Sequence, residues 1–178
     1  MTLSGLVLAL VTLQRLAELV LARRNTRRLL ARGAIEVASR HYGLIVAVHG
    51  AWLCGLWLLA PSEVPNPVWL LAFAGLQAGR LWVLASLGER WTTRIIVLPG
   101  APLVQRGPYR FVSHPNYAVV VGEIAVLPLA FDLPTFAVAF SALNAAALTV
   151  RIRAESAALR HAGSLPARDR VVQRTARG

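Results

Sequence analysis

The stretch Arg106-Gly-Pro-Tyr-Arg-Phe-Val-Ser-His-Pro-Asn-Tyr117 lies between two long apolar runs. Within twelve residues it holds two Arg, one His, two Tyr, one Asn and two Pro. Both prolines fix φ, and in a plain solvent loop the aromatic side chains would expose apolar surface to water. We therefore interpret this stretch as a rigid polar segment at the mouth of a membrane helix, where it would form a ligand site.

The composition around this segment is that of a membrane protein. Of the 178 residues, 56% are hydrophobic and 15% are charged, whereas a soluble domain carries about a quarter charged residues. Apolar runs recur at about 20 residues, the length of a membrane-spanning helix. The pattern predicts an all-α polytopic membrane protein of about five spans, near residues 3–22, 42–60, 68–87, 117–131 and 135–150.

The distribution of Arg predicts how the spans are oriented. The formal net charge is +11, and seventeen of the nineteen Arg lie in segments 23–40 and 88–116 and after residue 150. The turns 61–67 and 131–134 hold none. By the positive-inside rule the N-terminus lies outside and the C-terminus in the cytoplasm. Because the Arg residues flank apolar spans, we do not expect nucleic acid as a partner.

The sequence also predicts local elements. Residues 25–31 would form a short interfacial helix that ends at Gly33. Residues 94–98 and 103–106 would pair as a small hairpin around Pro99-Gly-Ala-Pro102. The last span is short, so it either tilts or continues past the interface. The lone Cys54 is expected to be a small buried hydrophobe.

Two features inside the spans are ambiguous. Arg15 and Glu18 lie three residues apart on one helix face, either as an ion pair near the interface or as the lining of an acceptor cavity. His49 lies near mid-membrane, where a histidine makes helix–helix hydrogen bonds or belongs to a site. We divide the chain into residues 1–60 with two spans, 61–162 with three spans and the site, and a basic cytoplasmic tail at 163–178.

Polar groups should converge at the cytoplasmic face from the 88–116 connector, the start of the fourth span and the end of the fifth. They are Tyr109, Arg110, His114, Asn116, Tyr117, Glu123, Arg151, Arg153 and Glu155. If Pro115 is the first helical residue, the amides beside it favour an anionic group. The set represents either ion pairs that anchor short helices or a binding pocket formed by the connector and the C-terminal helix.

The residues that carry this convergence resemble a known family. Gly107-Pro-Tyr-Arg-Phe-Val-Ser-His-Pro-Asn-Tyr117, with Glu123 and Arg151-x-Arg-x-Glu155 after it, is similar to the pattern of the isoprenylcysteine carboxyl methyltransferase family. That pattern is G-x-Y-x-x-x-R-H-P-x-Y followed by R-x-x-x-E-E. Ser113 and Ser156 depart from it, and both departures count more against a prenylcysteine acceptor than against the cofactor. The resemblance covers about residues 90–160, and residues 15–42 resemble bacterial members encoded beside type III polyketide synthases.

The resemblance implies an integral enzyme of the bacterial inner membrane that uses S-adenosylmethionine without a Rossmann domain. It would methylate a carboxylate or hydroxyl oxygen of a lipophilic acceptor, prenylcysteine-like or an alkylpyrone or related polyketide lipid. The alternatives are a phospholipid N-methyltransferase and a non-catalytic membrane scaffold or lipid-binding protein. No metal is needed, and no ligand cluster with the usual spacing is present.

The resemblance also implies roles for residues. His114, Tyr117 and either Arg110 or Arg153 would bind the carboxylate end of the cofactor, and Glu155 its ribose hydroxyls or amino group. The whole cofactor set is Leu98, Leu103, Tyr109, Arg110, His114, Pro115, Tyr117, Arg153 and Glu155, and the catalytic set is His114, Glu123 and Arg153. An acidic enol or carboxylate acceptor requires no strong base, whereas a phenol would require His114 or Glu123.

Overall fold

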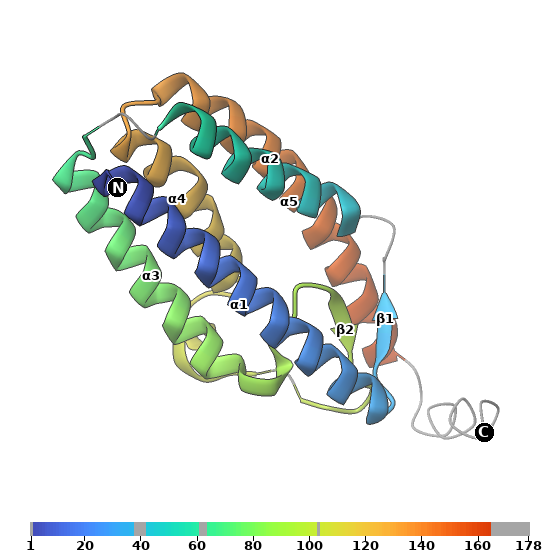
Figure 1. Ribbon diagram of the computed structural model, residues 1–178. Helices are drawn as coiled ribbons and strands as arrows, with labels where there is room; N and C mark the ends of the chain where they lie inside the picture. The colour runs from blue at the N-terminus through green and yellow to red at the C-terminus, as the bar shows by residue number, and fades with distance from the viewer. Residues whose placement is uncertain (1, 38–41, 61–63, 103, 165–178) are drawn as a thin grey trace.

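The computed structural model describes residues 2–37, 42–60, 64–102 and 104–164, and of residues 155–164 it describes the backbone alone. Its helices are α1 (Leu3–Ala31), α2 (Tyr42–Leu59), α3 (Pro67–Leu87), α4 (Pro115–Ala130) and α5 (Pro134–Ser164), with 3-10 turns η2 (Gly88–Arg90) and η3 (Gly107–Arg110). The strands are β1 (Ile35–Val37) and β2 (Ile95–Val97). The five helices form one elongated bundle, and the strands lie near the end of the molecule where α1 ends (Figure 1).

The bundle is that of an all-α polytopic membrane protein. Helices α1 and α2 and the helical segments Pro67–Arg90 and Pro134–Ala154 are long and apolar enough to cross a membrane, whereas α4 has only 16 residues. Large apolar side chains point away from the bundle, and Leu58 is 82% exposed. Cys54 is exposed as well, so the prediction that it is buried was wrong.

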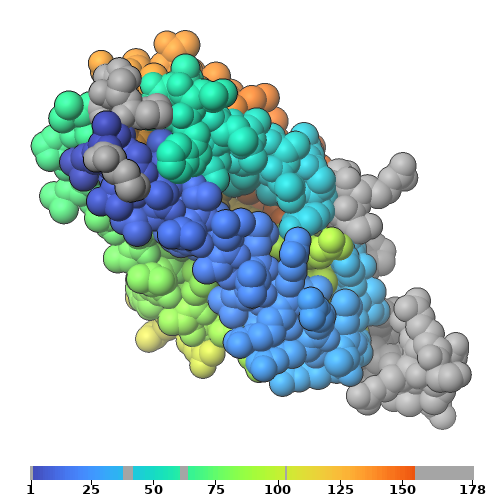
Figure 2. All heavy atoms as spheres, in the orientation of Figure 1, coloured from blue at the N-terminus to red at the C-terminus, as the bar shows by residue number. Residues whose placement is uncertain are grey.

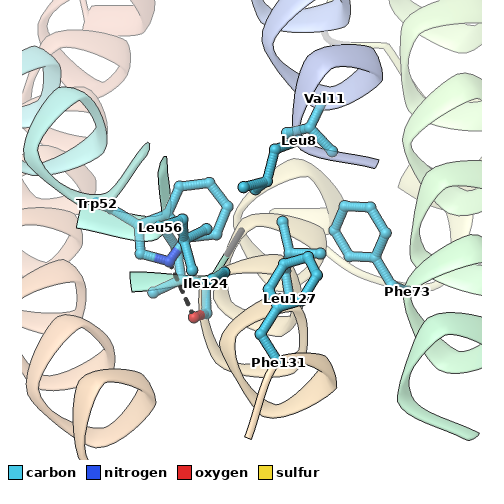
Figure 3. Packing of buried hydrophobic residues seen from close by; sticks show 9 residues of the cluster. Leu8, Val11, Trp52, Leu56, Phe73, Ile124, Leu127 and Phe131 are labelled. Atoms are coloured by element: carbon cyan, nitrogen blue, oxygen red, sulfur yellow. Dashed lines mark hydrogen bonds between the residues drawn. The ribbon is translucent and has the colours of Figure 1, made fainter. Parts of the chain in front are cut away.

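The hydrophobic core lies between the helices in the half of the bundle that holds the N-terminus. Its buried members come from four helices, with α5 packing against them: Leu8, Val11, Trp52, Leu56, Ala60, Phe73, Ile124, Leu127 and Phe131. Figure 3 shows Trp52 of α2 pointing at α4, where its indole N–H donates to the Ile124 carbonyl at 3.3 Å. At the same end, the Asn66 N–H donates to the Ala130 carbonyl at 2.7 Å. The start of α3 and the end of α4 are therefore level.

The basic segment after the first span does not form a helix of its own. Helix α1 continues without a break for 29 residues and ends in a Schellman turn, in which the Ala34 N–H bonds the Leu29 carbonyl and Gly33 has φ +85°. The segment holds no Gly or Pro that would interrupt the helix. Asn25 does not begin a new helix, because its amide donates to the Gly88 and Trp91 carbonyls at 3.2 and 2.9 Å.

The predicted hairpin within the 88–116 connector is also wrong. Strand β2 pairs antiparallel with β1, with Ile35 opposite Val97 and Val37 opposite Ile95, and residues 104–106 form no strand. Pro102 lacks the N–H that a returning strand would donate, and its carbonyl accepts from Arg90. The two polar connectors on this side of the bundle are thereby joined to each other.

The segment 106–117 is fixed to the end of α3. The Arg106 side chain donates through Nε to the Ser86 carbonyl at 2.8 Å. Gly107 has φ +60°, and a Cβ at this position would lie 2.0 Å from the Ser86 hydroxyl oxygen, so only glycine fits. Helix α4 begins at Pro115, as predicted. Helix α5 continues past residue 150 to Ser164, which was one of the two predicted alternatives.

Candidate active site

The start of α4 and the middle of α5 bring three of the expected polar side chains together, which we call the His114 cluster: His114, Tyr117 and Arg151. The His114 and Tyr117 rings stack with centroids 5.3 Å apart. Arg151 donates through Nε to the Tyr117 hydroxyl at 3.0 Å, and its guanidinium lies 5.8 Å from the centre of the tyrosine ring. The segment 106–117 and the end of the last helix thus meet across 34 residues of sequence.

Polar groups at and beside this cluster have bonding capacity that the described residues do not use. Among the side chains that the structure describes, no carboxylate pairs with Arg151. The side-chain oxygen of Asn116 is buried and accepts no hydrogen bond within the described residues. His114 is the N-cap residue of α4, and its side chain makes no capping bond. A cation from α5 therefore contacts the first turn of α4, which holds a buried acceptor and a helix N-terminus. This set suits a ligand that carries both a carboxylate and an amino group.

A second group of polar side chains lies inside the bundle, and we call it the intramembrane cluster: Gln14, Arg15, Glu18, Gln77, Arg80 and Glu123. Arg80 donates to both oxygens of Glu18 at 2.5 and 2.6 Å and to Glu123 at 2.8 Å. Arg15 pairs with Glu18 at 3.0 Å and with Glu123 at 2.9 Å. Both glutamines donate to the same carboxylates.

The charges of the intramembrane cluster neutralise one another. Two Arg and two Glu cancel in formal charge, and each carboxylate accepts from both guanidinium groups. Glu123 is 2% exposed and Arg80 is 7% exposed, so both are shielded from solvent and lipid. Charged groups inside a bilayer are costly unless they pair. The cluster joins α1, α3 and α4, and so it fixes the helix that begins with the His114 cluster.

His49 of α2 is half-buried, and its charge environment includes Arg15, Arg80 and Glu123. Its Nδ1 lies 2.8 Å from the Ile45 carbonyl of the same helix. A carbonyl can only accept, so Nδ1 carries the proton and Nε2 of a neutral ring has a free lone pair. This hydrogen bond is made within α2, so it is neither a bond between helices nor evidence for a site.

The other residues of the predicted site are dispersed around the two clusters. Leu98 follows β2 and is half-buried, and Leu103 lies outside the described residues. Tyr109 packs on a small apolar cluster formed by Ala22, Val83 and Trp91. The side chains of Arg110 and Arg153 are exposed, and Pro115 is buried. For Glu155 the structure gives only the backbone, one helical turn beyond Arg151.

Sequence reasoning missed the partners of Glu123. Gln77 and Arg80 are spaced to share a face of α3, as Gln14 and Glu18 are on α1, and polar residues within apolar spans were the available signal. The sequence alone does not say which helices are neighbours, so these pairs were left unassigned. In the part of the chain that the structure describes, no group of three or more His, Cys, Asp or Glu could hold a metal ion.

Comparisons with known proteins identify a family that the chain matches. The sequence model of the isoprenylcysteine carboxyl methyltransferase (ICMT) family matches residues 69–161, a range that includes both His114 and Arg151. The chain is 40% identical over 159 residues to "Uncharacterized protein YpbQ" of Bacillus subtilis (strain 168), with 86% of this chain and 95% of that protein covered. It is 26% identical to "Uncharacterized protein" of Haemophilus influenzae, with 83% and 89% covered. No solved structure matches the chain.

Proposed function

The chain belongs to the isoprenylcysteine carboxyl methyltransferase family, and on that premise we propose that it transfers a methyl group from S-adenosylmethionine to a lipophilic acceptor. The observation that carries the proposal is the contact between Tyr117 and Arg151. It joins the two sequence motifs of the family in one cluster, and the guanidinium of that cluster has no carboxylate partner among the described side chains.

The residues of the His114 cluster fit the polar end of the cofactor. Arg151 would bind the α-carboxylate, because its guanidinium has no carboxylate partner among the described side chains. The buried oxygen of Asn116 would accept from the amino group. His114 and the first amides of α4 would complete the anion site. Arg110 and Arg153 remain further candidates for the carboxylate, with Tyr109 and Pro115 beside them and Leu98 and Leu103 against the adenine.

Glu155 would bind the ribose hydroxyls or the amino group, because it lies one helical turn beyond Arg151 on α5. When bound, the cofactor supplies an electrophilic methyl group on a sulfonium. The protein's part is to hold the acceptor oxygen in line with that methyl group and to exclude water, so positioning supplies much of the rate. The anionic form of the acceptor neutralises the sulfonium charge, which a pocket of low dielectric favours.

A base is required only if the acceptor is a weak acid. Of the two candidates, Glu123 accepts from Arg15, Arg80 and Gln77, so both of its oxygens are already bonded inside the bundle. His114 is half-buried and makes no capping bond. We therefore assign proton removal to His114 and a positioning role to Glu123, with Arg153 as a further catalytic candidate near the cofactor.

We infer that the acceptor is a lipid or a lipidated molecule that enters from the bilayer. The apolar exterior of the helices places the whole site within reach of acyl or prenyl chains. The Arg distribution supports an inner bacterial membrane with the N-terminus outside and the His114 cluster facing the cytoplasm, from which the cofactor would enter.

Calorimetric titration of S-adenosylmethionine into detergent-purified protein tests the donor. We expect binding by the wild type and at least about tenfold weaker binding by His114→Ala, Arg151→Gln and Glu155→Ala. Failure of the wild type to bind would overturn the methyltransferase proposal. Binding that all three substitutions leave unchanged would overturn only the site assignment.

A methyl-transfer assay identifies the acceptor class. Prenylcysteine, an alkylpyrone and phosphatidylethanolamine are supplied in the same detergent with labelled cofactor. Product from either of the first two supports oxygen methylation. Product from phosphatidylethanolamine alone would replace it with phospholipid N-methylation.

A further inference from the structure

A cavity of about 310 Å³ lies between the C-terminal half of α1, the start of α2 and the strands, and its lining includes no residue of the His114 cluster. Its walls are Leu19, Arg23, Thr26, Arg27, Leu30, Glu36, Tyr42, Thr93 and Arg94. Figure 2 shows the surface hollowed between α1 and the first residues of α2, with deeper segments visible in the gap. Its volume is at the small end of ligand sites, sufficient for a head group but not for a whole lipid.

The cavity is positively charged. Three guanidinium groups and one carboxylate line it, which leaves a net charge of +2. Glu36 neutralises Arg94, with which it pairs at 2.6 Å, and Arg94 in turn stacks on the Tyr42 ring at 4.7 Å. The net charge therefore comes from Arg23 and Arg27. Arg23 and Arg27 have no carboxylate partner within the described residues.

The two unpaired Arg residues lie four apart on α1, so they share a face and repel each other. Two other Arg residues, one near the end of α1 and one at its C-cap, form ion pairs of a purely structural kind. Arg28 and Arg32 are also four apart, and both bind Glu89, at 3.0 and 2.9 Å. Arg23 and Arg27 instead direct their charge into a cavity that contains no unpaired acidic group among its lining residues.

The cavity lies at the depth of lipid head groups. Twenty residues of α1, from Leu3, span about 30 Å, the thickness of the hydrocarbon core. Arg23 follows directly on that span, and Arg27 is about 6 Å further along the helix. On the membrane side, Leu19 lines the cavity and Leu16 below it is 54% exposed. An acyl chain leaving the cavity toward the bilayer would therefore run along apolar side chains.

We propose that this cavity binds the phosphate of an anionic bilayer lipid, with Arg23 and Arg27 as its ligands. The Thr26 hydroxyl and one hydroxyl of the bonded pair Tyr42 and Thr93, whose oxygens are 3.2 Å apart, donate to the rest of the head group. The lipid's acyl chains lie along Leu19 and Leu16 in the gap between α1 and α2. This site requires only that α1 crosses the membrane, and it does not rest on the methyl transfer proposed above.

Native mass spectrometry of the full chain in a neutral detergent tests this site, with phosphatidylglycerol, phosphatidylcholine or inorganic phosphate added in turn. We expect one tightly bound phosphatidylglycerol on the wild type and about thirtyfold weaker binding by the double variant R23Q/R27Q. The matched control is R24Q/R28Q, which removes the same charge from the same turns of α1 outside the cavity. It should weaken binding by less than about threefold.

Three results would overturn the proposal. The first is equal weakening by the two double variants, which would mean diffuse surface charge. The second is a lack of lipid selectivity, either because phosphatidylcholine binds as tightly as phosphatidylglycerol or because neither lipid is retained. The third is displacement of phosphatidylglycerol by equimolar inorganic phosphate, which would mean a site for free phosphate. If R23Q/R27Q does not fold by gel filtration, the single variants R23Q and R27Q, each expected to lose about fivefold, take its place.

Discussion

Arg80 of α3, inside the bundle, and Arg151 of α5, which contacts the start of α4, are both guanidinium groups on membrane helices, but their surroundings differ. Arg80 is bonded to two carboxylates and is almost fully buried. Arg151 is bonded to a neutral hydroxyl and stacks near a ring, with no carboxylate beside it among the described side chains. A charge that the fold already neutralises holds helices together, whereas a charge left with spare donors is available to a ligand.

Removing the centre of the intramembrane cluster should have the largest effect. Arg80→Met leaves Glu18 and Glu123 with only Arg15, and we expect a loss of about 3–5 kcal/mol in stability because charge remains buried without its partner. Thermal unfolding in detergent, followed by circular dichroism, measures it. Arg153→Met is the control, since that side chain is exposed. A change in Arg80→Met as small as in the control would mean that the cluster does not hold the helices.

Gly107→Ala should have the next largest effect, because it strains the segment that supports the His114 cluster. The new Cβ would meet the Ser86 hydroxyl at 2.0 Å in a backbone conformation with φ +60°. We expect a loss of about 1–3 kcal/mol in the same unfolding measurement. Adding Ser86→Ala removes the hydroxyl and should restore part of the loss. No rescue would indicate that backbone strain alone, rather than contact with α3, sets the cost.

Arg151→Gln should show that the His114 cluster contributes to ligand binding and the intramembrane cluster to stability. Its stability should stay within about 0.5 kcal/mol of the wild type, because no carboxylate among the described side chains loses a partner. Its affinity for S-adenosylmethionine should fall about tenfold, measured by calorimetry. Arg153→Gln, two residues along the same helix, is the comparison. Equal losses in both variants would assign the carboxylate to neither residue specifically.

Tyr117→Phe should have the smallest effect. The substitution keeps the ring that stacks on His114 and removes the hydroxyl that accepts from Arg151 at 3.0 Å. Arg151 then loses one of the bonds that orient it, and cofactor affinity should fall about threefold with stability nearly unchanged. A loss larger than that of Arg151→Gln would show that the hydroxyl itself contacts the ligand.

The sequence was informative where local chemistry decides the structure. Apolar run lengths predicted the helical spans, and Pro115 predicted where α4 begins. The sequence-based predictions were wrong where contacts between distant segments decide the structure. The strand 95–97 had no signal for its partner 35–37, which comes from a different connector. Cys54 could not be assigned to the lipid or the core, since an apolar helix looks alike on every face.

The same limit applies to the site. His114 and Tyr117 are three residues apart in one motif, so their proximity is local and follows from the sequence. Arg151 and Arg153 could not be ranked, because which side of α5 faces Tyr117 depends on how α4 and α5 pack. The partners of Glu123 depend on three helices at once. Pairwise spacing along one chain carries no information about such contacts.

The short length of α4 has a consequence for where the chemistry takes place. At 1.5 Å per residue its 16 residues span about 24 Å, against about 31 Å for the 21 residues of α3. Since the end of α4 is level with the start of α3 through the Asn66–Ala130 hydrogen bond, the shortfall of about 7 Å falls at His114. Hydrophobic mismatch of this size draws the lipid surface inward locally. Under the proposed function, the acceptor would therefore meet the methyl donor while its tail stays embedded, without the work of lifting it out of the leaflet.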